Sequence, residues 1–243
     1  METPPSRQPF RAVATWCLCA SFVGIHGLVT YCFGPAVLKS FDFVPANPWR
    51  LGGLTFVTAT FLHYGWLHVG SNVCMTLFSG VHVEHLIGRW RVLLVFVVAG
   101  AAGHVAHRLL DPRLFWHSGG ASGGAYGLMT FYCLAYRRES IRSMATRLRR
   151  WLHLKTPAHR PNAFQRFRRS CLKRLGIPKG RLTVLHLLVA FVLFEAAGLA
   201  RQRAGLTAVS SAAHLGGTLA GAACYCLWKR VKSTRPALVS RHP

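Results

Sequence analysis

The chain has 243 residues, is 51% hydrophobic and has a mean hydropathy of +0.29. Its apolar residues come in long runs, which excludes an ordinary soluble domain. The formal net charge of +24 could suggest a nucleic-acid-binding protein, but the basic residues lie between the apolar runs and not over one folded surface. This pattern is typical of the cytoplasmic loops of a membrane protein, so we expect no nucleic-acid partner.

Six apolar stretches are each near the roughly 20 residues needed to cross about 30 Å of hydrocarbon. They span residues 12–33, 66–83, 91–109, 120–136, 182–200 and 209–228. We therefore expect an all-α membrane protein, built as a six-transmembrane helical bundle. The first stretch is longer than the apolar part of a usual signal peptide, roughly 7–15 residues, which favours an uncleaved helix.

The segment 137–181, between the fourth and fifth stretches, carries 15 of the 30 Lys and Arg residues. The positive-inside bias predicts that it is cytoplasmic, and an even number of spans places both termini there. The expected organisation is a cytoplasmic tail 1–11, a membrane domain 12–228 that includes the insert 137–181, and a basic cytoplasmic tail 229–243. A plasma membrane or bacterial inner membrane is the expected location. A basic amphipathic helix over 142–154 is expected to bind anionic lipids of the bilayer.

Polar residues begin in the first outward loop, where Trp49 and Arg50 suit a membrane interface. In the second span His68 and Asn72 are four residues apart, so they share a helix face, and His63 precedes them. Such side chains are costly in lipid unless they face protein or water. A zinc site is conceivable here, but no nearby carboxylate or cysteine completes it. We expect neither a metal nor another cofactor.

The fourth span opens with Gly120-Ala121-Ser122-Gly123. Small residues on both sides of a serine leave its hydroxyl open to a substrate. A helix N-terminus also offers free N–H groups to a developing oxyanion. Taken alone, this motif favours a close crossing of small-residue helices. In the sixth span, small residues recur every four positions beside His214. They are Ala213, Gly217 and Gly221. This stripe predicts close packing of the sixth span on the start of the fourth.

Depth in the membrane links these residues. Ser122 and His214 each lie 15 residues from the basic residue that marks the inner end of the span. At 1.5 Å per residue, both sit about 22 Å above that boundary, roughly 8 Å below the outer surface. The same estimate places Asn72 at about 18 Å and His68 at about 24 Å. A serine and a histidine at one depth can act as nucleophile and general base.

The third member of a catalytic triad is not evident from the sequence. The chain has only six acidic residues, and none is adjacent to His214. The nearest along the chain, Glu195, lies close to Arg201 and Arg203, where a local ion pair is the plain expectation. The sequence therefore predicts a Ser-His dyad.

Together these motifs resemble the rhomboid family of intramembrane serine proteases. The matching residues are Trp49, Arg50, His63, His68, Asn72, Gly120, Ser122, Gly123, Tyr126, His214, Gly217 and Gly221. The resemblance implies an endopeptidase that cuts single-pass or polytopic membrane proteins in or near their transmembrane segments. It implies that Ser122 is the nucleophile and His214 the base. It also implies that His68, Asn72 and the Ser122 N–H donate to the oxyanion.

The resemblance also implies supporting roles. Tyr126 would pack against His214, His63 would support the loop structure, and Trp49 and Arg50 would help to build the first loop. The long basic insert departs from the family pattern. Two other classes of function remain: a catalytically inactive rhomboid-like scaffold that binds membrane clients, and a polytopic transporter that uses buried histidines. The absence of acids in the middle of the predicted spans argues against the transporter.

Overall fold

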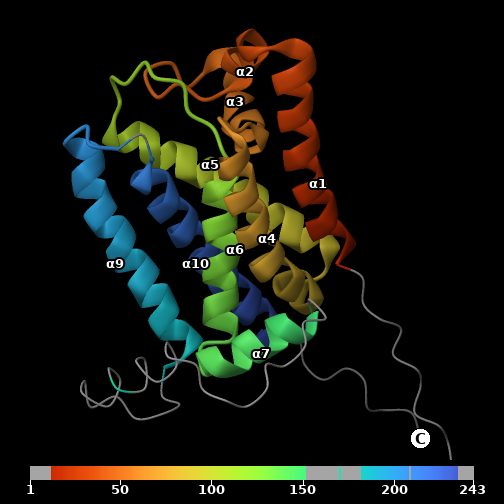
Figure 1. Cartoon of the computed structure of the whole chain (residues 1–243). Coiled ribbons are helices and arrows are strands. Elements are labelled where there is room, and N and C mark those ends of the chain that lie inside the picture. The colour runs from red at the N-terminus through yellow and green to blue at the C-terminus, as the bar shows by residue number, and fades with distance from the viewer. Residues whose placement is uncertain (1–11, 152–169, 171–181, 208, 235–243) are drawn as a thin grey trace, which may run out of the picture. The chain divides into compact units, whose positions relative to one another are not determined.

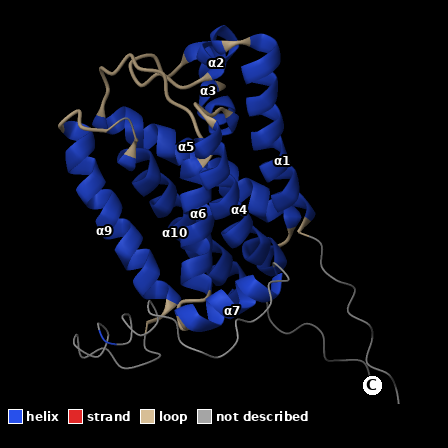
Figure 2. Ribbon diagram, in the orientation of Figure 1, coloured by secondary structure: helices blue, strands red, loops and turns tan. Residues whose placement is uncertain are grey.

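The computed structural model describes residues 12–151, 170, 182–207 and 209–234. The tail 1–11, most of the insert and the last nine residues lie outside the described part, so the predicted division into tails and membrane domain stays a prediction. The described residues are helical, and among them no strand occurs, only two isolated β-bridges (Figure 2).

The helices follow one another along the chain as labelled in Figure 1. They are α1 (Val13–Leu28), η1 (Val29–Phe33), α2 (Pro35–Phe41), η2 (Arg50–Gly53), α3 (Thr55–Thr58), η3 (Ala59–Phe61), α4 (Trp66–Ile87), α5 (Arg89–Leu110), α6 (Ser122–Ala135), α7 (Ile141–Trp151), α9 (Val184–Arg203) and α10 (Ser211–Thr234). By their contacts the residues group into two compact units, Met1–Tyr132 with Val192–Pro243, and Cys133–Phe191.

The six expected spans correspond to the six helices α1 with η1, α4, α5, α6, α9 and α10, and the predicted class of all-α membrane protein is confirmed. Among the described residues, three helices are long and apolar enough to cross a membrane: Val13–Phe33, Arg89–Leu110 and Val184–Arg203. The other three helices that match predicted spans do not meet this combination of length and apolar composition. Helix α4 carries several polar residues, α10 ends in basic ones, and α6 has only 14 residues.

In the first unit, α10 packs along α5 through small residues. A Cβ added at Gly103 would lie 2.7 Å from the Ala213 carbonyl oxygen, and one added at Gly216 would lie 2.7 Å from that of Ala102. Distances this short leave no room for a side chain. Backbone therefore meets backbone. The sequence analysis did not predict this contact with α5, because it assigned the small-residue stripe, Ala213 included, to the fourth span.

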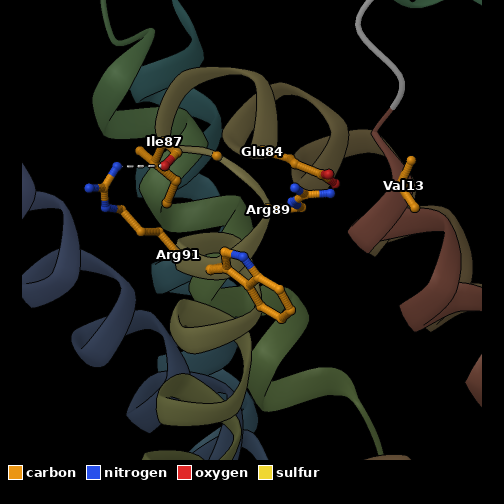
Figure 3. Close-up of a pocket in the computed structure, with 7 residues that line it drawn as sticks. Val13, Glu84, Ile87, Arg89 and Arg91 are labelled. Carbon is orange, nitrogen blue, oxygen red and sulfur yellow. Dashed lines mark hydrogen bonds between the residues drawn. The ribbon is translucent and has the colours of Figure 1, made fainter.

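Glu84 fixes the start of α1. Its carboxylate accepts hydrogen bonds from the backbone N–H groups of Ala14 and Thr15, at 3.0 and 2.8 Å, and from the Thr15 hydroxyl at 2.7 Å. Figure 3 shows Glu84 near Val13, at the first turn of α1. The carboxylate satisfies N–H groups that a helix N-terminus leaves without intrahelical partners. Glu84, near the end of α4, is thus a buried cap for a different helix.

The second unit brings the two ends of the basic insert together. The Ile141 N–H donates to the Leu182 carbonyl at 3.0 Å, and the Val184 N–H donates to the Glu139 carbonyl at 2.9 Å. A helix is present over Ile141–Trp151, which confirms the predicted helix as far as residue 151, and residues 152–154 lie outside the described part. Binding of lipid by α7 stays a prediction.

Candidate active site

Ser122 is the first residue of α6. The chain reaches it through an extended segment whose backbone pairs with the first loop: Phe43 and Ser118 form a two-bond bridge at 2.8 Å, and the Gly120 N–H donates to the Ala59 carbonyl at 2.9 Å. The first turn of α6 contains no acidic residue. Because the first N–H groups of a helix lack intrahelical acceptors, the Ser122 N–H is available to a ligand.

Gly120 brings the second span against this turn. Its φ is +144°, which disfavours a side chain, and a Cβ there would lie 2.8 Å from His68 Nε2 and 3.9 Å from Asn72 Nδ2. Asn72 is 3% exposed, and its Nδ2 makes no hydrogen bond with any described residue. A buried amide donor without an acceptor is costly, so its place beside the serine turn suggests an acceptor that arrives with a ligand.

His63 supports the turn from the loop before α4. Its Nδ1 lies 3.2 Å from the Phe61 carbonyl, and its Nε2 accepts a long hydrogen bond of 3.4 Å from the Ala121 N–H. Burial, reinforced by the neighbouring His68, lowers the pKa of His63 to about 4. The ring is therefore neutral at neutral pH, with the proton on Nδ1 and an accepting Nε2.

His214 is the fourth residue of α10 and lies against α6. The Tyr126 ring stacks on the imidazole, with centroids 4.3 Å apart and planes 9° from parallel. Ser122 and Tyr126 are four residues apart, so they share one face of α6. The stacking therefore places His214 on the face of α6 that carries Ser122.

The glycine stripe allows this approach. A Cβ added at Gly217 would overlap the Gly123 carbonyl oxygen, and one added at Gly221 would overlap that of Gly127. Helices α6 and α10 thus touch backbone to backbone one turn and two turns below His214. The predicted close contact between the fourth and sixth spans is confirmed.

The expected pairing of Glu195 is wrong. Its Oε1 lies 3.0 Å from His214 Nδ1, whereas Arg201 and Arg203 are both exposed. The reason is that Glu195 faces α10 while the two arginines point to the outside of α9. The expectation that no acid accompanies His214 is wrong as well, because sequence adjacency was the test applied and the contact joins two helices.

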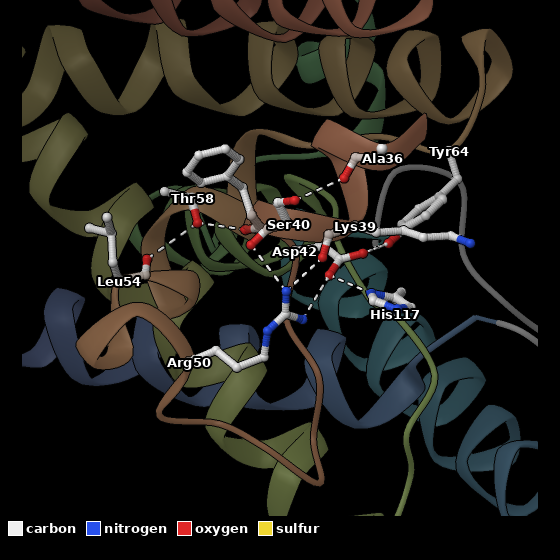
Figure 4. Close-up of polar contacts among 10 residues, drawn as sticks. Ala36, Lys39, Ser40, Asp42, Arg50, Leu54, Thr58, Tyr64 and His117 are labelled. Atoms are coloured by element: carbon white, nitrogen blue, oxygen red, sulfur yellow. Dashed lines mark hydrogen bonds and ion pairs between the residues drawn. The ribbon is translucent and has the colours of Figure 1, made fainter. Parts of the chain in front are cut away.

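A second buried carboxylate, that of Asp42, organises the loops (Figure 4). It accepts a 2.6 Å hydrogen bond from the Tyr64 hydroxyl, lies 2.7 Å from His117 Nδ1 and pairs with Arg50 Nη1 at 3.4 Å. Burial and the bond to Asp42 raise the pKa of Tyr64, so the hydroxyl stays protonated as a donor. The sequence did not reveal this cluster, since its members come from three separate loops.

The two loop residues of the sequence motif lie side by side in the chain but differ in environment. Arg50 Nη2 donates to the carbonyls of Lys39 and Ser40, at 2.6 and 3.0 Å, and so holds the end of α2. Trp49 is 74% exposed and its ring packs edge-on against Phe56. Arg50 therefore helps to build the first loop, while the role of Trp49 at a membrane interface stays a prediction.

A pocket of about 550 Å³ lies elsewhere, at the junction of α1, α4 and α5 (Figure 3). Its lining includes Glu84, Arg89 and Arg91, but neither Ser122 nor His214. Glu84 is already occupied as the cap of α1, and Arg91 donates to the Ile87 carbonyl at 3.1 Å. The candidate site is therefore assigned from the serine, the histidine and their neighbours, and not from this pocket. No cluster of three potential metal ligands occurs in the described part of the chain.

Comparisons with known proteins agree with this arrangement. A family model described as the rhomboid domain matches residues 46–155. The putative rhomboid protease YdcA of Bacillus subtilis is 30% identical over 139 residues, which cover 50% of this chain and 69% of that protein. Rhomboid protease GluP of the same organism is 31% identical over 103 residues, 41% of this chain and 19% of GluP.

Human rhomboid-related protein 3 is 35% identical over 88 residues, which cover 35% of this chain and 19% of that protein. The chain thus spans only about a fifth of the length of GluP and of the human relative, but more than two thirds of YdcA. The apolar helices and these relatives together identify a membrane protein. The chain belongs to the rhomboid family.

Proposed function

We propose that the protein is an intramembrane serine endopeptidase that hydrolyses peptide bonds in or near transmembrane segments of membrane proteins. Ser122 is the nucleophile and His214 the general base. The observation that carries this proposal is the stack of Tyr126 on His214, on the helix face that begins with Ser122. The names of three relatives support the same reaction class: rhomboid protease GluP, rhomboid-type serine protease 2 of Emericella nidulans and the putative rhomboid protease YdcA.

The reaction follows from the roles of these groups. The imidazole of His214 takes the Ser122 hydroxyl proton while the oxygen attacks the scissile carbonyl carbon. The oxyanion that forms accepts hydrogen bonds from the Ser122 N–H, from Asn72 Nδ2 and from His68. The imidazolium then protonates the leaving amine and the peptide bond breaks. Water attacks the acyl-enzyme by the same route in reverse, releasing the carboxylic acid and restoring the hydroxyl of Ser122.

The membrane sets the substrate class and the orientation. A serine at the start of a 14-residue helix, reached by a loop, lies below the outer surface, where a transmembrane segment of another protein can meet it. We further propose that both termini and the basic insert are cytoplasmic, in a plasma membrane or bacterial inner membrane. On that side the arginines of α7 would bind anionic lipid headgroups.

Reconstitution tests the proposal. The full chain and Ser122→Ala are placed in proteoliposomes with a labelled single-pass membrane protein, and cleavage products are identified by mass spectrometry. We expect cleavage near one end of the transmembrane segment by the parent protein and none by the variant. Substrate that co-purifies with both proteins but is cut by neither contradicts the proposal and favours the inactive scaffold.

A further inference from the structure

The second half of helix α9 buries one residue, and that residue is a carboxylate. Between Val192 and Arg203 the only buried residue is Glu195, which is 2% exposed, while its apolar neighbours Leu193 and Phe194 are 65% and 67% exposed. An ionised group in a membrane helix is costly unless it faces protein and is paired. The helix therefore turns its least lipid-compatible residue inward, onto α10.

The carboxylate meets a defined set of groups. Oε1 lies 3.0 Å from His214 Nδ1 and accepts a short hydrogen bond from the Tyr126 hydroxyl. Ser211 lies beside the same carboxylate. A Cβ added at Gly198, one turn along from Glu195, would overlap the Ser211 hydroxyl, so the glycine leaves α10 room to approach. Glu195 and Tyr126 thus hold the imidazole on two sides.

Charge distinguishes the pair from an ordinary polar contact. Within the described part of the chain, His214 is the one ion-pair partner of Glu195. Nδ1 is buried and, although 3.0 Å from Oε1, is not aligned with it as a standard hydrogen bond. Coulomb attraction needs no such alignment, and it grows when the imidazole gains a proton during the reaction. Catalytic hydrogen bonds also often tighten only when substrate is bound.

We infer that Glu195 is a positioning residue for His214, an inference that rests on the proposed function. Its carboxylate keeps the proton of the neutral imidazole on Nδ1, which leaves Nε2 to take the proton of Ser122. It also stabilises the imidazolium that forms in that step. The site is then a serine, a histidine and a glutamate from three different helices, and not a dyad.

Glu195→Gln tests this role because the amide oxygen can still accept from Tyr126 while the charge is lost. We expect kcat to fall about 10- to 100-fold with little change in KM, as when a partner that orients a reactive group is removed. Glu195→Asp keeps the charge and should retain a larger share of the parental kcat. Glu139→Gln, the same substitution in the second compact unit, is the matched control for kcat per folded molecule.

Nitrogen-15 NMR of the histidines in detergent micelles tests the contact without activity. The groups that face His214 from neighbouring helices are Glu195, Tyr126 and His68. The NMR signal of His214 is assigned by its loss in His214→Ala. We expect Nδ1 to carry the proton of the neutral ring in the parent, and Nε2 to carry it in a larger share of the molecules of Glu195→Gln.

An unchanged kcat and an unchanged His214 tautomer in Glu195→Gln would overturn the inference. A merely structural contact would lower the amount of folded protein in both Glu195 variants without changing kcat per folded molecule or the tautomer. That outcome also overturns it. If the parent itself cleaves nothing, the proposed function fails, and the NMR tautomer still decides whether Glu195 acts on His214.

Discussion

Asp42 and Glu195 are both buried carboxylates, and the comparison between them separates structure from chemistry. Each accepts a hydrogen bond from a tyrosine hydroxyl and lies within 3.0 Å of a histidine Nδ1. Asp42, however, also pairs with Arg50, whose guanidinium binds two loop carbonyls. The charge of Asp42 is thus compensated within the loops.

Glu195 has no arginine partner, and its charge acts on the imidazole of His214 alone among the described ion pairs. The histidine beside Asp42, His117, has a side chain that is 36% exposed, whereas that of His214 is 11% exposed. The two carboxylates therefore have different roles: that of Asp42 stabilises the loops, and that of Glu195 is proposed to act on His214. Changes at the helices around His214 should alter turnover per folded molecule, and changes at Asp42 should alter the amount of folded protein.

The largest effect on the chemical side is expected at Asn72. Its unpaired Nδ2 is proposed to bind the oxyanion, so Asn72→Ala should lower kcat about 100- to 1000-fold with little change in KM, the loss seen for one oxyanion donor. Cys74→Ala, an exposed position on the same helix, is the control. Steady-state cleavage in proteoliposomes measures both. Parental kcat in Asn72→Ala and in the double variant with His68→Ala would remove these residues from the mechanism.

Gly217→Val tests the close contact between α10 and α6 that places His214 near Ser122. The added side chain overlaps the Gly123 carbonyl, and overpacking costs about 1–3 kcal/mol of stability. Displacement of His214 by about 1 Å should lower activity roughly a hundredfold. The protein should still insert and purify.

Thr218→Val, about 100° further around α10, should keep its activity and serves as the matched control. Both variants are compared by cleavage rate per folded molecule. Full activity of Gly217→Val together with loss in Thr218→Val would mean that the wrong face of α10 has been assigned to α6.

On the structural side, Asp42→Asn should destabilise the loops. A hydrogen bond to a charged group contributes about 1.5–3 kcal/mol, and the amide keeps one acceptor, so a loss of about 2 kcal/mol is expected. Thermal unfolding in detergent measures it, with Ser40→Ala, whose hydroxyl bonds only within α2, as the control. Cleavage per folded molecule should stay within about twofold of the parent. A large fall in kcat at unchanged stability would break the distinction between Asp42 and Glu195.

A smaller effect follows from His63. Its pKa falls from 6.5 to about 4 on folding, so the unfolded chain binds more protons between these values. Stability is therefore full above pH 6.5 and is lost as the pH falls toward 4, by about 1.4 kcal/mol at pH 5.5. Unfolding at pH 7.5 and 5.5 measures the loss, and His63→Gln should show a weaker dependence. An equal dependence in the variant would mean that His63 does not carry it.

The sequence predicted those features that depend on the spacing of residues within one segment of the chain. Runs of about 20 apolar residues predicted the long helices, and glycines four residues apart predicted the contact between α6 and α10. The depth estimate for Ser122 and His214 used only the regular rise of a helix, and it stays a prediction. These signals depend only on spacing along one chain segment.

The contacts of Glu195 and Asp42 could not be read in this way. Each joins elements far apart in the chain, and no spacing rule states which face of α9 meets α10 or which loops meet at Asp42. One signal was present: Glu195 is the only acid in an otherwise apolar fifth span, and such a residue needs a partner inside the protein. The short helices α2 and α3 were also missed, since four to seven residues carry too little periodicity.

The most direct test of the central claim is chemical labelling of Ser122. The purified parent is treated with a fluorophosphonate, and the modified peptide is identified by mass spectrometry, with Ser122→Ala, His214→Ala and Ser211→Ala treated alike. We expect one adduct, on Ser122, absent from the first two variants and present in the third, because only a serine activated by His214 reacts. Labelling that survives Ser122→Ala, or an adduct on another residue of the parent, would contradict the account.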